Sequence, residues 1–196
     1  MNQSGESAPR IELLAVEAAR QAAEEAEVPV AFAELNIFRA LLHRPRTAKA
    51  LCDLLVSLLF AGELDHRLRE LVIMRIGWVT GSDYEWTQHW KIAQERFGVN
   101  ADDLLALRDW RRADRFGPAE RAALAATDET LETGTISPAC WAQCEAHLGG
   151  RNQCIELVAA IGAWRLVSQL VRSLAIPLEA GVASWPPDGQ RPPAAG

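Results

Sequence analysis

The sequence concentrates its chemistry-bearing side chains in one stretch, residues 70–89. Glu85 and His89 are four residues apart, so they share one face of a helix and can interact. A histidine beside a carboxylate can exchange protons near neutral pH, as general acid–base catalysis requires. Trp86 and Trp90 would wall this pair with apolar surface. The pattern therefore predicts a proton-transfer site at Glu85 and His89.

A second carboxylate, Glu70, stands in an apolar run and is expected to be partly buried. A buried carboxylate needs a partner. The sequence offers His89 across a helical hairpin, or Arg69 or Arg75 within the same run. In a catalytic site, Glu70 lies within hydrogen-bond reach of the imidazole, directly or through one water. In a purely structural arrangement, Glu70 pairs with an arginine and Glu85 only caps its helix. Ion-pair networks of this kind resemble active sites, so both arrangements stay open.

Two helices joined by a sharp break must bring these groups together. Asp65 is a suitable N-cap for a helix that reaches residue 79, and Thr80-Gly81 interrupts the helical pattern. Ser82 and Glu85 match the capping box S-x-x-E, which predicts that the next helix starts at Ser82 and runs to residue 97. The break would fold the first helix back alongside the second.

Helical spacing continues along the remaining chain, and no segment alternates like a β-strand. The other expected helices cover residues 10–27, 33–42, 45–61, a short stretch after Asn100, 118–132, 138–147 and 152–174. The length suits one domain. We expect a loose N-terminus over residues 1–9, a single helical domain over 10–182, and a flexible Pro/Gly-rich tail over 183–196, which Trp185 could dock.

A weak internal echo relates two parts of this chain. Ile161-Gly162-Ala163-Trp164 resembles Ile76-Gly77-Trp78, and Glu156-Leu157-Val158 repeats Glu70-Leu71-Val72. Such an echo suggests two similar helical hairpins that face each other.

Composition excludes several classes of function. The formal charge is −6 and the basic residues are scattered, which argues against nucleic-acid binding. Charged residues interrupt each apolar run before it reaches membrane-spanning length, so we expect no membrane span. The first residues carry neither a charged n-region nor an apolar h-region, so we expect no secretory signal and a cytoplasmic location.

The four cysteines are expected to be reduced, buried residues. Cys140, Cys144 and His147 form a C-x3-C-x2-H cluster that could suggest a metal site. A zinc site needs a fourth ligand and usually has tighter C-x2-C pairs. Residues four apart on a helix also rarely meet disulfide geometry. We therefore expect no metal site and no disulfide here.

The motif around Glu70, Glu85 and His89 resembles the carboxymuconolactone decarboxylase family, which includes the alkylhydroperoxidase D-like proteins. The resemblance rests on residues 64–75 and 80–93 and extends over roughly residues 35–180. It implies an all-α, alkylhydroperoxidase D-like helical bundle and a homotrimer or homohexamer.

The family's peroxidase members carry a glutamate, then C-x-x-C, then a histidine four residues after the second cysteine. By that spacing, Glu70 and His89 match the glutamate and the histidine, and the two cysteines fall on Ser82 and Glu85. A serine and a glutamate cannot form a disulfide or attack a peroxide as a thiolate. The sequence is therefore similar to the cysteine-free, decarboxylase-like branch.

The resemblance implies a cofactor-free lyase that acts on a small carboxylated lactone or related acid, as in aromatic catabolism. Glu70, Glu85 and His89 would perform general acid–base catalysis. An arginine should hold the substrate carboxylate, and the candidates are Arg75, Arg165 and Arg46. The residues expected to contact the substrate are Ser82, Trp86 and Arg75.

Two alternatives belong to other classes of function. One is an oxidoreductase or antioxidant protein of the peroxidase branch that works without the usual Cys-x-x-Cys. The other is a binding protein whose degenerate site holds a small ligand without turnover.

Overall fold

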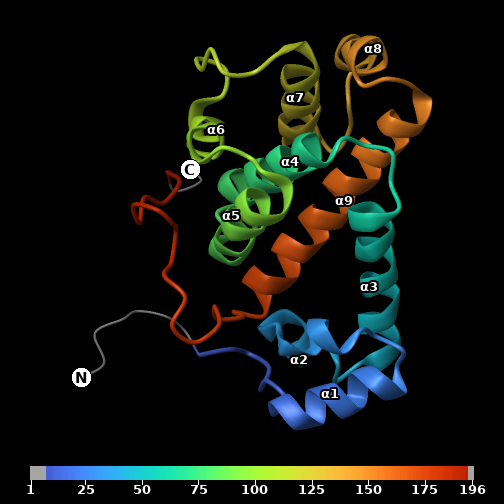
Figure 1. Ribbon diagram of the computed structural model, residues 1–196, viewed down its shortest axis with the longest axis vertical. Helices are drawn as coiled ribbons and strands as arrows, with labels where there is room; N and C mark the ends of the chain where they lie inside the picture. The colour runs from blue at the N-terminus through green and yellow to red at the C-terminus, as the bar shows by residue number, and fades with distance from the viewer. Residues whose placement is uncertain (1–7, 194–196) are drawn as a thin grey trace. The chain divides into compact units, whose positions relative to one another are not determined.

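The computed structural model describes residues 8–193, which form helices and short connections with no strand among them (Figure 1). The all-α prediction is confirmed. The α-helices are α1 Val16–Glu25, α2 Asn36–Leu41, α3 Pro45–Phe60, α4 His66–Thr80, α5 Asp83–Phe97, α6 Ala101–Ala106, α7 Pro118–Thr133, α8 Pro138–His147 and α9 Arg151–Ser173, with 3-10 helices at Val30–Glu34 (η1) and Leu107–Asp109 (η2).

The described chain divides into two compact units. The first unit contains residues 8–56 and 169–182, and the second contains residues 57–168 and 183–193. Helices α3 and α9 each have residues in both units. Every residue of the predicted site lies in the second unit.

The first unit shows where tertiary contacts override local propensity. Helix α1 begins at Val16 rather than near residue 10. The backbone N–H of Arg10 donates to the Leu174 carbonyl at 2.9 Å, and that of Leu14 donates to the Arg39 carbonyl at 3.2 Å. These bonds hold the preceding residues outside the helix despite their helix-forming side chains.

Helix α4 is the central element of the second unit. The Asp65 carboxylate accepts from the Leu68 N–H at 2.9 Å, which caps the helix start as predicted. The helix ends at Gly81, whose φ of 66° is left-handed and favours glycine. Helices α5 and α7 both pack against α4 (Figure 1), and most of its side chains are buried. A polar residue on the buried part of α4 is removed from water and therefore needs a hydrogen-bond or charge partner within the protein.

Gly77 sets how closely α4 and α5 approach. A Cβ atom at this position would lie 3.0 Å from the Trp86 backbone nitrogen and 3.3 Å from the Glu85 Cβ. Real Cβ contacts are rarely this short, so any larger residue would push the two helices apart. The missing side chain at Gly77 therefore lets the first turn of α5 lie directly on α4.

Residues 183–193, expected as a tail that Trp185 could dock, pack against α5. The Trp185 side chain is buried, and the Trp185 backbone N–H donates to Asp83 Oδ1 at 3.0 Å. Trp86 Nε1 donates to the Pro186 carbonyl at 2.8 Å. Arg108 bonds both carboxylate oxygens of Asp188, at 2.7 and 2.8 Å. Residues 194–196, and residues 1–7 of the expected loose N-terminus, lie outside the described part of the chain.

The sequence predicted no apolar segment of membrane-spanning length, but helix α9 meets that criterion. Among the described helices it alone is long and apolar enough to cross a membrane by length and composition. Half of its most apolar window is buried within the protein, as in the core helix of a globular fold.

The close contact at Gly77 generates a stability prediction. Replacing Gly77 with alanine should lower the free energy of unfolding by about 1–3 kcal/mol, because the new methyl group meets the α5 backbone. Gly162→Ala is the matched control, since a Cβ there meets no atom within 4 Å. It should raise stability by about 0.5–1 kcal/mol through the helix propensity of alanine. Urea denaturation measures both changes, and a stabilised Gly77→Ala variant would contradict the packing argument.

Candidate active site

Glu70 and His89 meet across the α4–α5 hairpin. His89 Nδ1 lies 2.8 Å from Glu70 Oε2. Glu70 is fully buried, and the His89 side chain is 11% exposed. The predicted hydrogen-bond reach between these two residues is confirmed.

Arg69 is the second partner of the same carboxylate. Its Nε and Nη2 lie 3.3 and 3.2 Å from Glu70 Oε1. Its Nη1 donates to the carbonyls of Leu58 and Leu59. The arginine pair and the histidine pair, two alternatives from the sequence, therefore occur together. A buried carboxylate held from both sides in this way is strongly compensated.

Trp164 on α9 completes the surroundings of the imidazole. Its Nε1–H donates to His89 Nε2 at 3.3 Å, with the two rings edge to face. This bond requires an Nε2 without a proton, so we assign the neutral His89 proton to Nδ1, where it points to Glu70. The sequence analysis missed this role, although the echo of Ile76-Gly77-Trp78 had singled out the segment that contains Trp164.

The environment favours proton uptake by His89. Burial opposes the imidazolium, but the charge and hydrogen bond of Glu70, with the charge of Glu85, outweigh it and raise the pKa of His89. Because Nδ1 already faces Glu70, the added proton goes to Nε2. Protonation then removes the acceptor that Trp164 uses.

Glu85 points its carboxyl group away from the cap that the sequence predicted. Ser82 Oγ accepts from the Glu85 N–H at 3.4 Å, but the Ser82 N–H donates to the Gly77 carbonyl at 2.8 Å. Only one of the two capping-box hydrogen bonds forms, because the Ser82 N–H does not donate to the Glu85 carboxylate. Within the described chain, its buried Oε2 has no hydrogen-bond partner. Burial, together with the charge of Glu70, raises the pKa of Glu85 to about 7, although His89 acts in the opposite direction.

Ser82 and Trp86 lie beside the acid–base group and are fully buried. Ser82 caps α5, and the Trp86 N–H is used by the Pro186 carbonyl. Trp86 packs against Trp78, Trp90 and Trp185, which form an apolar wall with it. Their substrate contacts stay predictions, because the structure gives both residues structural partners.

Arg75 does not join the other predicted site residues, which corrects that expectation. Its Nε and Nη2 donate to the Asp128 carboxylate at 2.7 and 3.1 Å, and its Nη1 donates to the Leu107 carbonyl at 2.8 Å. Although burial opposes it, the hydrogen bond and charge of Arg75 hold the pKa of Asp128 below its usual value. These hydrogen bonds of Arg75 fasten α4 to α7 and η2.

The four cysteines are free and buried, as the core interpretation predicted. Cys140 and Cys144 direct their thiols at the Ala122 carbonyl, at 3.9 and 3.7 Å. Burial raises the pKa of all four thiols, that of Cys144 to about 12. Thiols in this state are poor nucleophiles at neutral pH.

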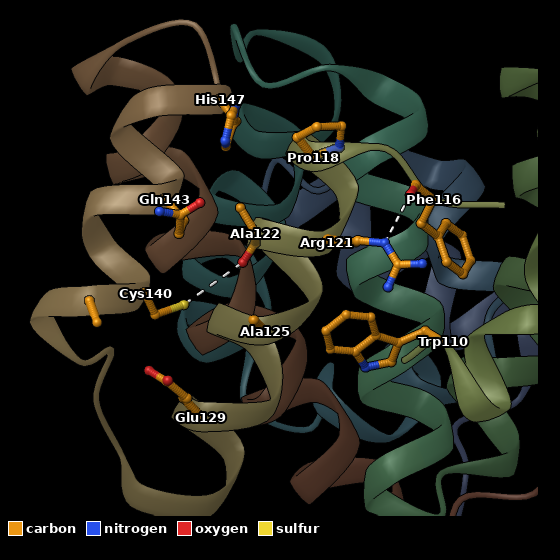
Figure 2. A pocket seen from close by; sticks show the side chains of 11 residues that line it. Trp110, Phe116, Pro118, Arg121, Ala122, Ala125, Glu129, Cys140, Gln143 and His147 are labelled. Atoms are coloured by element: carbon orange, nitrogen blue, oxygen red, sulfur yellow. Dashed lines mark hydrogen bonds between the residues drawn. The ribbon is translucent and has the colours of Figure 1, made fainter. Parts of the chain in front are cut away.

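A cavity of about 730 Å³ opens beside helices α7 and α8 (Figure 2). Its lining includes Trp110, Phe116 and Cys140, while Arg121 turns its Nε toward the Phe116 carbonyl at 3.0 Å. Neither carboxylate of the acid–base group nor His89 lines this cavity. It is therefore separate from the site predicted by the sequence.

The comparison with protein families identifies this arrangement. Residues 45–129 match the model of the carboxymuconolactone decarboxylase family, and that region contains Glu70, Glu85 and His89. This segment of the chain is therefore similar to the carboxymuconolactone decarboxylase family. The family resemblance seen in the sequence is confirmed. None of the curated proteins matches the sequence closely enough to count as a relative.

Solved structures share the family's alkylhydroperoxidase D-like fold. A peroxidase-related protein from Silicibacter sp. TM1040 has a TM-score of 0.70 at 13% identity and covers 91% of this chain and 96% of its own. An alkylhydroperoxidase AhpD core protein from Ralstonia eutropha JMP134 has a TM-score of 0.68 at 18% identity, with 88% and 93% covered. A cysteine-to-alanine variant of the debrominase Bmp8, in complex with 2,3,4-tribromopyrrole, has a TM-score of 0.65 at 20% identity, with 84% and 86% covered. At these identities the likeness shows the fold alone.

The buried carboxyl of Glu85 makes stability depend on pH. Its folded pKa of about 7 exceeds the ordinary glutamate value, so the folded state binds the extra proton and stability falls as pH rises from about 4.5 to about 7. Glu85→Gln should remove this loss and become more stable relative to the wild type by about 1–3 kcal/mol between pH 5 and pH 8. His89, with its raised pKa, loses stability in the same direction, so the slope of the variant is reduced rather than abolished. Urea titrations at both pH values measure the difference. The exposed Glu145→Gln is the control, and equal slopes in the wild type and Glu85→Gln would exclude a raised pKa.

Proposed function

We propose that this protein is a cofactor-free lyase of the carboxymuconolactone decarboxylase type that acts on a small carboxylated lactone or related acid. The observation that carries the proposal is the 2.8 Å contact between Glu70 Oε2 and His89 Nδ1, beside the buried Arg69. A histidine oriented by a carboxylate through one ring nitrogen can exchange protons through the other.

The reaction needs one proton donor and a place for developing negative charge. The C–C bond to the substrate carboxylate breaks, carbon dioxide leaves, and the electron pair stays on the substrate as a dienolate. His89 gives the proton on Nε2 to the dienolate carbon, while Glu70 holds Nδ1 and stabilises the imidazolium. General acid catalysis of this kind typically contributes about 10²–10⁴-fold.

A second candidate is an oxidoreductase of the peroxidase branch. The names of the neighbours from Silicibacter and Ralstonia favour it, although that likeness is one of fold. Against it stand Ser82 and Glu85 at the positions of the redox cysteines, and the burial of the four cysteines that the chain does contain.

A homotrimer or homohexamer is a further part of the proposal. Ile155, Val158 and Leu166 are exposed on one face of α9, and Gly162 between them leaves open space. Contiguous exposed apolar residues often mark a contact between proteins. Light scattering of the purified protein measures the assembly, and a monomer at micromolar concentration would exclude it.

His89 is the residue whose loss should stop turnover. His89→Ala should lower kcat by at least about 10²-fold on a panel of carboxylated γ-lactones, because the proton donor is removed. His147→Ala is the control for a histidine change outside the acid–base group. Carbon dioxide release measures the rate, and circular dichroism checks the fold. A variant that binds the lactone more weakly while the wild type releases no carbon dioxide would favour the degenerate binding protein.

The peroxidase candidate predicts a different outcome. Because the cysteines are buried with raised pKa, we expect no thiol-dependent turnover of alkyl hydroperoxides above that of a Cys140→Ser, Cys144→Ser double variant. Dithiothreitol-coupled peroxide consumption measures this. Robust activity that the double variant loses would replace the lyase proposal with the oxidoreductase one.

A further inference from the structure

The Glu85 carboxyl group contains a buried oxygen that lacks the hydrogen bond such atoms usually make. Its Oε2 is buried and has no hydrogen-bond partner among the described residues. Buried polar atoms in folded proteins are almost always hydrogen-bonded, and an exception calls for an explanation such as catalysis or a missing ligand. The base of this side chain lies close against α4, because a Cβ atom added at Gly77 would be only 3.3 Å from Glu85 Cβ.

The groups around Glu85 are already committed to one another. Both nitrogens of His89 have partners, Glu70 at Nδ1 and Trp164 at Nε2. Both oxygens of Glu70 have partners, His89 and Arg69. While His89 is neutral, Glu85 Oε2 is thus a buried polar atom of this cluster that lacks a hydrogen-bond partner among the described residues. The partly exposed side chain of His89 keeps the cluster from being sealed.

The charges that act on Glu85 favour its neutral form. Burial is the largest influence, the Glu70 carboxylate on α4 adds to it, and His89 on α5 opposes it, which places the pKa of Glu85 at about 7. Arg69, the cation nearest in sequence to Glu70, is directed to that residue.

The other elements beside α5 use their charges elsewhere. On α6, Asp103 pairs with Arg67 and Arg115. In residues 183–193, Asp188 pairs with Arg108. None of these pairs includes Glu85.

We infer that Glu85 works as a neutral carboxylic acid that donates its Oε2 hydrogen bond to an oxygen anion of the ligand, either a carboxylate or the enolate formed from it. An acid kept neutral in an apolar site can donate in this way to an oxygen on which charge develops. This inference rests on the proposed function for the identity of the anion as substrate. It also accounts for anion recognition without Arg75, whose guanidinium bonds Asp128 on α7 and the Leu107 carbonyl in η2.

The role of Glu85 is distinct from that of His89 in the proposed reaction. When carbon dioxide leaves, the electron pair of the broken C–C bond spreads onto the conjugated carbonyl oxygen. Glu85 donates a hydrogen bond to that oxygen and keeps its proton throughout. His89 transfers the proton that the carbon receives. Glu85 therefore lowers the barrier by stabilising charge, and the substrate class is narrowed to small acids whose carboxylate loss leaves an enolate.

Infrared spectroscopy tests the protonation state without a substrate. Between pH 5 and pH 9, the full-length protein should show the C=O stretch of a protonated carboxyl that titrates near neutral pH. The band should persist in Glu145→Gln and be absent from Glu85→Gln. If the glutamine variant does not fold, ¹³C-labelling of the glutamates makes the same titration in the wild type. No neutral-range carboxyl band would overturn the inference.

Binding of benzoate, which stays ionised from pH 6 to pH 9, tests the donor role. Benzoate should shift the carboxyl band, and its affinity for the wild type should fall at least about tenfold between these pH values as Glu85 loses its proton. Glu85→Gln, a neutral donor at every pH, should bind with a flatter profile, its remaining slope belonging to His89. Equal slopes in both proteins, an unshifted band or no benzoate binding would overturn the inference. Lactone turnover is measured separately, so an inactive protein with a titrating Glu85 contradicts only the proposed function.

Discussion

The buried Glu70 carboxylate is the constraint on which the rest of the site depends. It stands on the most enclosed helix of the second unit, where an uncompensated charge would be very costly. Arg69 satisfies one oxygen and His89 the other. The arginine comes from the same helix, but the histidine must come from α5. The position of α5 on α4 is therefore tied to the compensation of one charge, and the orientation of the His89 imidazole follows from it.

Backbone geometry then decides what Glu85 can do. In a full capping box its carboxyl would accept from the Ser82 N–H. That N–H instead donates to the Gly77 carbonyl, at the same glycine that lets the two helices approach closely. A single close contact thus places Glu85 beside Glu70 and also removes its local partner. The cost of an unsatisfied carboxyl oxygen is accepted at the place where ligand chemistry is proposed, as functional sites often require.

The sequence predicts this site well where the information is local. Glu70, Glu85 and His89 follow from helical spacing and from the break at Gly81, because a short turn leaves few ways to fold a hairpin. Trp164 does not follow, since nothing local ties a residue 75 positions away to the imidazole. The ordering of residues 183–193 is equally non-local: proline and glycine predict flexibility, but Asp83 and Arg108 supply partners from distant helices. The pairing of Arg75 with Asp128 is non-local in the same way, because Asp128 lies on α7.

The two carboxylates differ because their surroundings differ, although they act on each other. Glu70 has a cation and an imidazole within hydrogen-bond distance, whereas Glu85 has burial and the negative field of Glu70. The hydrogen bonds of Glu70 suit it to orient His89, whereas the raised pKa of Glu85 suits that residue to hold a proton in the proposed function. In the family's peroxidases this second position carries a cysteine, whose chemistry depends on losing its proton. A glutamate that acts by keeping its proton has the opposite requirement from such a cysteine. Under the proposed function, the same scaffold would then support acid–base chemistry in place of redox chemistry, with the histidine and the first glutamate left where they are.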